Sequence, residues 1–132
     1  MTSAIRVLLV DDEPAIRRGL RMRLALEPDV DVVGEANNGL GAIEMTRSLQ
    51  PDVVVMDVRM PVMDGITATR RILEEHLGQP IIALSLYDDS VTMQGALSAG
   101  ACAFIAKSRM DSTLVDTIRT VRRKCEGMEG EE

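Results

Sequence analysis

Three carboxylates and one lysine come directly after short apolar segments of this 132-residue chain. Asp11 and Asp12 follow the first such segment, Asp57 follows three valines and a methionine, and Lys107 follows the apolar residues 103–106. If these segments are strands of a parallel sheet, their carboxyl ends meet at one edge, so groups about 95 residues apart can share a site. Acidic oxygens beside an ammonium group suit a hard metal ion and a phosphoryl group.

The three carboxylates predict a bound cation. Neighbouring carboxylates repel one another and take up protons unless a cation joins them, and an all-oxygen site suits Mg²⁺ better than zinc. Mg²⁺ keeps several waters and takes one or two carboxylates besides phosphate oxygens, which leaves one aspartate free to react. That aspartate can accept a phosphoryl group as an acyl phosphate. Lys107 would supply positive charge, and Ser85 would supply a hydroxyl donor.

The elements that must position these residues alternate along the chain. Short β-branched runs and amphipathic helical stretches follow one another five times, which is typical of a parallel α/β sheet with helices on both faces. The predicted strands are residues 5–10, 30–36, 53–56, 81–84 and 103–106. Right-handed crossovers favour a flavodoxin-like, doubly wound sheet of five strands in the order 2-1-3-4-5. That order brings Asp11 and Asp12 beside Asp57.

Local signals bound the five predicted helices. The first begins near Pro14, where proline is tolerated, and the second follows an asparagine cap at residues 37–38. The third follows Asp64, and the fourth is capped within residues 88–90 but weakened by an interior Gly95. The fifth begins near Asp111. Four arginines of the first helix are expected to face water or a partner: Arg17, Arg18, Arg21 and Arg23.

Size and composition favour one small domain in a reducing, cytoplasmic setting. The net charge of −6 would repel nucleic-acid phosphates, and two cysteines are too few for a disulfide framework. No apolar stretch approaches the ~20 residues of a membrane helix, and no secretory leader is recognisable. We expect a folded domain over residues 1–125. Residues 126–132, rich in glycine and glutamate, are predicted to be a disordered tail or a linker stub.

From Val7 to about Val121, the chain resembles the receiver domain of two-component response regulators. The segments that carry this resemblance keep the family's order and spacing: residues 10–14, 56–65, 84–85, 100–101 and 104–107. Residues 34–36, 64–71 and the Lys107-Ser108 junction resemble the NarL/LuxR-type subfamily, whose members carry a C-terminal helix-turn-helix output domain. Ser108 stands where most receivers have a proline, which makes a cis peptide bond improbable there.

The resemblance implies a role for each site residue. Asp57 is the implied phosphoacceptor, and Mg²⁺ is bound by Asp12, Asp57 and the backbone carbonyl of Arg59, with Asp11 assisting through water. Lys107 is implied to contact the phosphoryl group, while Ser85 rotates towards it and Phe104 swings inward on activation. By their position two residues beyond site residues, Arg59 and Tyr87 are hypothesised to tune hydrolysis of the acyl phosphate.

The implied function is a phospho-switch controlled by a sensor histidine kinase. Phosphorylation of Asp57 would promote a homodimer, through the first and fifth helices by analogy with the subfamily. DNA would be contacted only by an output domain outside this chain, and no membrane is involved. The alternative is a stand-alone receiver that acts through protein contacts or a phosphorelay, without DNA-binding output.

Functions of other classes fit the residues less well. A flavodoxin-like cofactor binder needs backbone donors after the first strand, but residues 11–14 are acidic there and lack glycine. A phosphohydrolase with an aspartate nucleophile would want an acid two residues later, where Arg59 stands. We therefore expect only slow self-catalysed phosphorylation and dephosphorylation rather than an enzyme. A scaffold that binds no phosphate is disfavoured by the complete set of site residues.

Overall fold

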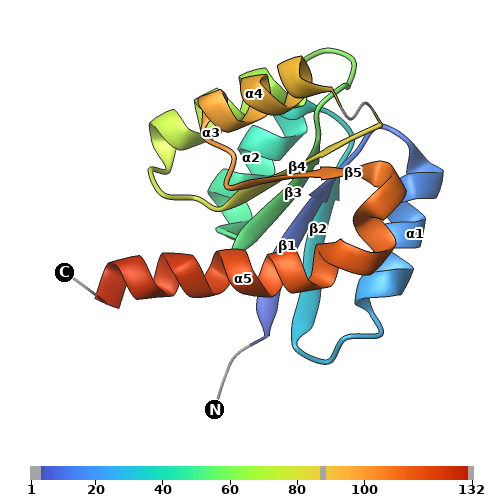
Figure 1. Cartoon of the computed structure of the whole chain (residues 1–132), viewed down its shortest axis with the longest axis vertical. Helices are drawn as coiled ribbons and strands as arrows, with labels where there is room; N and C mark the ends of the chain where they lie inside the picture. Colours follow the sequence, from blue (N-terminus) through green and yellow to red (C-terminus); the bar gives the residue numbers. More distant parts are fainter. Residues whose placement is uncertain (1–3, 87–88, 131–132) are drawn as a thin grey trace.

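A five-stranded parallel sheet between two layers of helices forms the core of the molecule (Figure 1). The computed structural model describes the backbone of residues 4–86 and 89–130 and the side chains as far as Arg122. The strand order is β2-β1-β3-β4-β5, and every neighbouring pair is parallel. The predicted flavodoxin-like fold and its 2-1-3-4-5 order are confirmed.

The strands are apolar runs because both faces of the sheet are covered. Their bounds are β1 (Ile5–Val10), β2 (Val30–Ala36), β3 (Val53–Asp57), β4 (Ile81–Ser85) and β5 (Ala103–Ala106). Every residue of β3 and β4 is buried, whereas β2, at one edge, is mostly half-buried. β3 and β4 each run one residue further than the sequence predicts. Asp57 and Ser85 are therefore the last residues of strands.

Two helices cover one face of the sheet. These are α1 (Pro14–Leu24) and α5 (Met110–Gly130), which is preceded by a short 3-10 turn, η1 (Lys107–Arg109). Leu20 and Leu24 of α1 join Leu114 and Ile118 of α5 in one apolar cluster with the strands. Leu114, Ile118 and Val121 of α5 are all buried on this face. The division of the chain at residue 125 stays a prediction.

The other face is covered by α2 (Gly39–Leu49), α3 (Gly65–Glu75) and α4 (Ser90–Ala99) (Figure 1). Ala42, Ile43, Ala68 and Ile72 pack against β1 and β3 there. Two apolar residues of these helices, Leu49 of α2 and Ile66 of α3, are only partly buried. α4 buries mainly alanines and leaves Val91 and Leu97 exposed.

Side-chain caps begin the three helices of that face, since the first N–H groups of a helix have no partner within it. The capping residues are Asn38, Asp64 and Asp89. They accept hydrogen bonds from the backbone N–H groups of Gly41 at 2.9 Å, Thr67 at 2.8 Å and Thr92 at 2.7 Å. These predicted caps are confirmed. The three helices α2, α3 and α4 follow the carboxyl ends of β2, β3 and β4.

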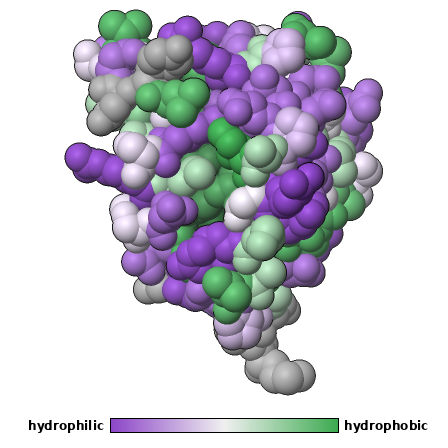
Figure 2. All heavy atoms as spheres, turned by 90° about the vertical axis from the view of Figure 1, so that its right-hand side faces the viewer, coloured by the Kyte–Doolittle hydropathy of each residue, from purple (hydrophilic) through white to green (hydrophobic). Residues whose placement is uncertain are grey.

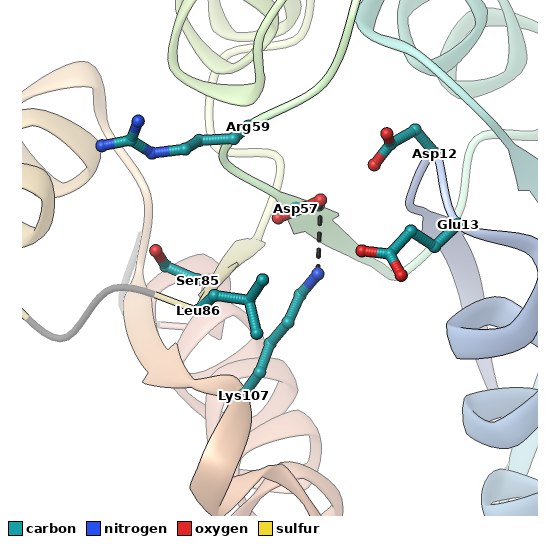
Figure 3. Close-up of a pocket in the computed structure, with 7 residues that line it drawn as sticks. All are labelled: Asp12, Glu13, Asp57, Arg59, Ser85, Leu86 and Lys107. Atoms are coloured by element: carbon teal, nitrogen blue, oxygen red, sulfur yellow. Dashed lines mark ion pairs between the residues drawn. The ribbon is translucent and has the colours of Figure 1, made fainter.

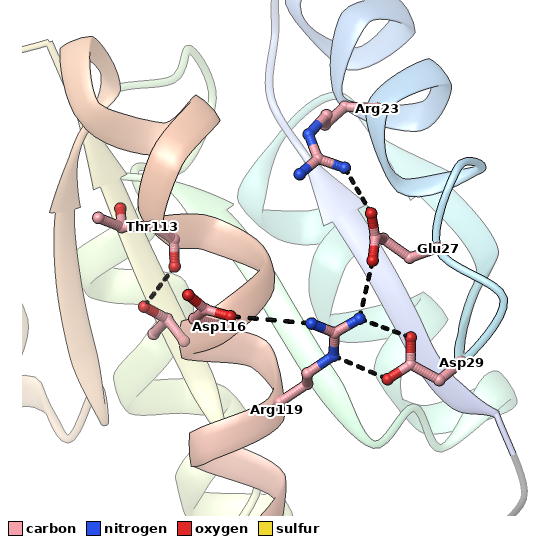
Figure 4. Close-up of polar contacts among 7 residues, drawn as sticks. Arg23, Glu27, Asp29, Thr113, Asp116 and Arg119 are labelled. Carbon is pink, nitrogen blue, oxygen red and sulfur yellow. Dashed lines mark hydrogen bonds and ion pairs between the residues drawn. The ribbon is translucent and has the colours of Figure 1, made fainter.

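Charged side chains join α5 to the turn between α1 and β2 (Figure 4). Arg119 contacts Asp29 through Nε at 2.8 Å and Glu27 through Nη2 at 2.8 Å. Glu27 also accepts from Arg23 of α1 at 2.9 Å. These contacts hold the pKa of the Glu27 and Asp29 carboxyls below their usual range, and the pKa of Arg119 is raised by the same hydrogen bonds.

One side of the molecule is polar over much of its surface (Figure 2). Figure 2 shows one side of the molecule, which is mostly hydrophilic with an apolar strip near its centre. Among the described residues, no helix has the length and apolar character needed to cross a membrane.

Candidate functional site

The predicted site residues meet at the carboxyl edge of the sheet. Asp11 directly follows β1, Asp57 ends β3, Ser85 ends β4, and Lys107 follows β5 as the first residue of η1. β1 and β3 are neighbours in the sheet and pair as far as Val10 and Met56, so the residues that follow, Asp11 and Asp57, lie next to each other at this edge. The strand order thus gathers groups that are far apart in the sequence.

Three carboxylates form the acidic part of the site. Asp11, Asp12 and Asp57 each place one oxygen within 4.8 Å of the others. Asp11 is 1% exposed and Asp57 is 5% exposed, whereas Asp12 is half-buried at the surface of the cluster. Their grouping, predicted from the strand order, is confirmed.

Lys107 joins two of these carboxylates from the opposite side. Its Nζ atom lies 2.9 Å from Oδ2 of Asp11 and 3.3 Å from Oδ2 of Asp57. Burial by itself lowers the pKa of Lys107, but the contacts with both carboxylates outweigh burial and raise its pKa above the ordinary value. Lys107 therefore stays charged at neutral pH, and one cation faces three acidic groups.

The surroundings of Asp57 disfavour the ionised form of its carboxyl group. Burial and the negative charge of Asp11 raise the pKa of Asp57 to about 6, although Lys107 and the backbone N–H of Arg59 oppose this shift. At neutral pH the carboxylate is mainly ionised, and it gains from any cation that binds beside it.

A pocket of about 100 Å³ opens over Asp57. Figure 3 shows its lining: Asp12 and Glu13 on one side, Lys107 reaching towards Asp57 from below, and the Arg59 side chain extending away from the centre. Ser85 and Leu86 complete the lining. Since a water occupies about 30 Å³ of liquid, the pocket has room for a small ion with its waters or for a phosphoryl group.

The oxygen donors at this pocket fit Mg²⁺. Carboxylate oxygens are the ligands that this ion prefers, and three of them converge here. Oδ2 of Asp11 is buried and receives no aligned hydrogen bond from the residues that the structure describes, although Lys107 lies at ion-pair distance. The raised pKa of Asp57 likewise marks a site short of positive charge.

Ser85 and Phe104, the two residues predicted to respond to the site, differ in their burial. Ser85 is buried at the end of β4 and lines the pocket. Phe104 is half-buried and packs against a small apolar cluster that includes Val58 and Ala96. Tyr87, the second residue predicted to tune hydrolysis, lies outside the described residues.

The side chain of Arg17, which contacts the loop that carries Asp11, is less exposed than the sequence predicts. Arg17 was expected to face water or a partner with the other arginines of its helix, but its side chain is only 19% exposed. Its Nη1 donates to the backbone carbonyl of Asp11 at 2.6 Å, and its Nε pairs with Glu35 at 3.2 Å. Helical periodicity does not reveal such a contact, because it joins a side chain to the backbone of a loop.

Comparison with known proteins identifies the family to which this chain belongs. The response regulator receiver domain family matches residues 7–119. The transcriptional regulatory protein LiaR of Bacillus subtilis (strain 168) is 37% identical over 119 residues, covering 90% of this chain and 56% of LiaR. A protein-glutamate methylesterase/protein-glutamine glutaminase of Methanosarcina mazei is 39% identical over 132 aligned positions, covering 90% of this chain and 36% of that protein.

A solved structure agrees with these relatives. The crystal structure of a LuxR-family two-component response regulator from Aurantimonas sp. SI85-9A1 superposes with a TM-score of 0.89 at 34% identity, covering 92% of this chain and 87% of that one. This chain spans between about a third and somewhat over half of the length of the two curated relatives. The part shared with the solved structure is the α/β unit.

Proposed function

Because this chain belongs to the response regulator receiver domain family, we propose that Asp57 accepts a phosphoryl group from the phosphohistidine of a sensor histidine kinase. The observation that carries the proposal is the pocket over Asp57, where this buried carboxylate faces open space between two acids and Lys107. The family binds Mg²⁺ at an acidic pocket, and the three converging carboxylates match that requirement.

The metal would be held by residues at the ends of β1 and β3 and in the loop that follows β3. Asp12 and Asp57 would bind it directly, together with the backbone carbonyl of Arg59, and Asp11 would assist through water. When bound, Mg²⁺ supplies positive charge that neutralises oxygens of the transferring phosphoryl group. The remaining steps belong to the protein's own residues.

In the transfer, a carboxylate oxygen of Asp57 forms a bond to phosphorus while the bond from phosphorus to the kinase histidine nitrogen breaks. Lys107, which contacts Asp57 at 3.3 Å, would then pair with a phosphoryl oxygen. Ser85 would donate its hydroxyl to another phosphoryl oxygen from the end of β4. The product is an acyl phosphate on Asp57, and no second substrate is turned over.

The added charge would act on the neighbouring elements. A phosphoryl group that draws Ser85 inward leaves room behind β4, and Phe104 of the adjacent strand β5 would swing into it. α4 begins four residues beyond Leu86 and buries mainly small side chains, so its position would respond. Arg59 and Tyr87 would tune the lifetime of the acyl phosphate by limiting water access to the pocket.

The output of the whole protein is a further part of the proposal. LiaR is named as a transcriptional regulator, and the relative from Aurantimonas belongs to the LuxR family, so a helix-turn-helix domain controlled by this receiver is the favoured output. The methylesterase relative shows that similar receivers occur with an enzymatic domain as well. The overall acidic charge of this chain makes DNA contact by the receiver itself unfavourable.

The experiment uses a small phosphodonor in place of the kinase. The purified chain, the Asp57→Asn variant and the Asp57→Glu variant are incubated with acetyl phosphate and Mg²⁺, with and without a chelator, and their intact masses are measured. We expect one acid-stable, base-labile phosphoryl adduct on the unsubstituted chain with Mg²⁺ only. An adduct that persists in Asp57→Asn, or that forms equally with the chelator, would contradict the proposal.

A further inference from the structure

Arg17 of α1 lies behind the acidic cluster rather than in it. Its Nη1 donates to the backbone carbonyl of Asp11 at 2.6 Å, and its Nε contacts Oε1 of Glu35 on β2 at 3.2 Å. Oε2 of the same glutamate accepts from Arg21 Nη1 at 2.6 Å. A chain of polar contacts thus runs from the edge strand, through Arg17, to the loop that presents the acids.

This placement does not serve the helix that carries Arg17. α1 begins at Pro14, so Arg17 lies near its N-terminus, where the helix dipole disfavours positive charge. The first turn of α1 contains no acidic residue that would offset this charge locally. The contact with Asp11 therefore needs a reason outside helix stability.

The carbonyl that Arg17 contacts belongs to the peptide group between Asp11 and Asp12. Asp11 is held at its other polar atoms as well: its N–H donates to the Ala36 carbonyl at 3.1 Å, and its Oδ1 accepts from the Glu13 N–H at 2.9 Å. By contrast, Asp12 forms no hydrogen bond or ion pair with the part of the chain that the structure describes. The direction of the Asp12 side chain then depends on the plane of the peptide before it.

We propose that Arg17 is a positioning residue for the metal site: by fixing the Asp11–Asp12 peptide, it orients the Asp12 carboxylate for Mg²⁺. The inference rests on the proposed function, since it assumes that Asp12 is a ligand. Partners that orient metal ligands typically contribute about 10- to 100-fold to metal affinity. Arg17 acts here through the backbone and does not touch the metal.

If Arg17 acted only through its charge, its removal would change the metal affinity in the opposite direction. Arg17 is a cation near a cation site, so removing its charge should strengthen metal binding if electrostatics alone decided the outcome. Removing a positioning contact should weaken it. Arg21 supplies the matched control, because it pairs with the same glutamate but is 51% exposed and contacts Glu35 rather than the Asp11 carbonyl.

The experiment measures metal binding directly. The unsubstituted chain and the Arg17→Met, Arg17→Lys and Arg21→Met variants are titrated with Mn²⁺ as a paramagnetic probe, and the free ion is quantified by electron paramagnetic resonance. Competition with Mg²⁺ reports the affinity for that ion. Thermal melts of the metal-free proteins are recorded in parallel to compare their folding.

We expect Arg17→Met to weaken Mn²⁺ binding about tenfold, with Arg21→Met close to the unsubstituted chain. Arg17→Lys keeps the charge but cannot bridge the carbonyl and Glu35 in the same way, so we expect an intermediate loss. Should Arg17→Met be poorly folded, the Lys variant carries the test. Equal or tighter binding by the Arg17 variants would overturn the inference alone, while no binding by the unsubstituted chain would overturn it together with the proposed metal site.

Discussion

Asp57 keeps its negative charge in a buried position beside a second carboxylate, with one lysine as the neighbouring side-chain cation. This arrangement costs stability while the site lacks a further cation, because burial and Asp11 both disfavour the ionised form. The same arrangement favours Mg²⁺ binding, since a bound cation relieves the repulsion. The instability of the acidic cluster is thus coupled to the function proposed for it.

The pKa of Asp57 predicts how stability depends on pH. Its pKa rises from 3.8 to about 6 on folding, so between these values the folded chain binds more protons than the unfolded chain. The free energy of unfolding should therefore fall as pH rises through this window. Asp57→Asn removes this dependence and should stabilise the metal-free protein at pH above 7 by up to about 3 kcal/mol.

Urea unfolding at several pH values, in a chelator, measures this effect. The gain from Asp57→Asn should shrink as pH falls from about 6 towards 3.8, and it should vanish only well below 3.8, where the carboxyl is protonated in both the folded and the unfolded state. Added Mg²⁺ should stabilise the unsubstituted chain more than the variant. A gain that is independent of pH would contradict the explanation from the Asp57 charge.

The positions of some site residues can be predicted from the sequence, whereas their contacts cannot. The types of Asp11, Asp57 and Lys107 and their places after strands could be predicted, because parallel strands end at one edge. The contact of Arg17 could not, since it depends on how α1 is rotated over the loop. The φ angle of 69° at Val62 is equally hidden, because a β-branched residue rarely adopts a left-handed conformation.

At the scale of elements, the loop between β3 and α3 requires a glycine at its end. A Cβ atom on Gly65 would collide with the backbone carbonyl of Asp57, and the N–H of Gly65 donates to the Val58 carbonyl at 2.7 Å. α3 therefore begins in contact with the end of β3, the strand whose last residue is Asp57. The spacing from Asp57 to Gly65 is therefore constrained by the backbone contact between these two residues.

Two glycine substitutions should have opposite effects. Gly65→Ala should displace the loop, lowering both stability and the rate of Asp57 phosphorylation. Gly19→Ala, within α1 where a Cβ meets nothing within 4 Å, should stabilise the fold by about 0.5–1 kcal/mol and leave phosphorylation unchanged. Thermal melts and phosphorylation rates of both variants provide the measurement. A harmless Gly65→Ala would show that the loop can relax away from the collision.

The Arg119 contacts should stabilise the position of α5 in a salt-dependent way. Arg119→Met removes the pairs with Glu27 and Asp29, so its melting temperature should be lower by a few degrees in dilute buffer. The difference should shrink in about 1 M salt, where charges are screened. Arg70→Met, at an exposed arginine of α3, is the control. An unchanged difference in high salt would indicate lost packing instead.

The elements themselves were predicted well because their signals are local. The structure contains the predicted strands and the predicted helix start at Pro14. It also contains the predicted cap residues Asn38, Asp64 and Asp89. The partial exposure of Leu49 and Ile66 cannot be predicted from helical spacing, because spacing gives the apolar face of a helix but not how closely a neighbouring helix covers it.

At the scale of the whole molecule, we predict that phosphorylation changes the association of the chain. A dimer through α1 and α5 would cover Met22, which is 64% exposed on α1. Sedimentation velocity before and after phosphorylation should show a shift from monomer to dimer. Met22→Asp should abolish the shift, whereas Leu77→Asp, at an exposed apolar residue after α3, should not. Dimers that survive Met22→Asp would place the interface elsewhere.

The molecule as a whole was predictable in its architecture because alternating elements and crossover rules leave one economical strand order. Its output and partners are not encoded in the fold, since relatives with this α/β unit include both transcriptional regulators and methylesterases. The proposed function therefore depends most on the chemistry of Asp57.

The measurement that tests it most directly locates the phosphoryl group. After reaction with acetyl phosphate and Mg²⁺, borohydride reduces an aspartyl phosphate to homoserine, and peptide mapping identifies the converted residue. We predict that homoserine forms at position 57 alone, that its formation requires Mg²⁺, and that its yield is lower in Lys107→Met. Conversion at Asp11 or Asp12, or no conversion at any aspartate, would contradict the claim that Asp57 is the phosphoacceptor.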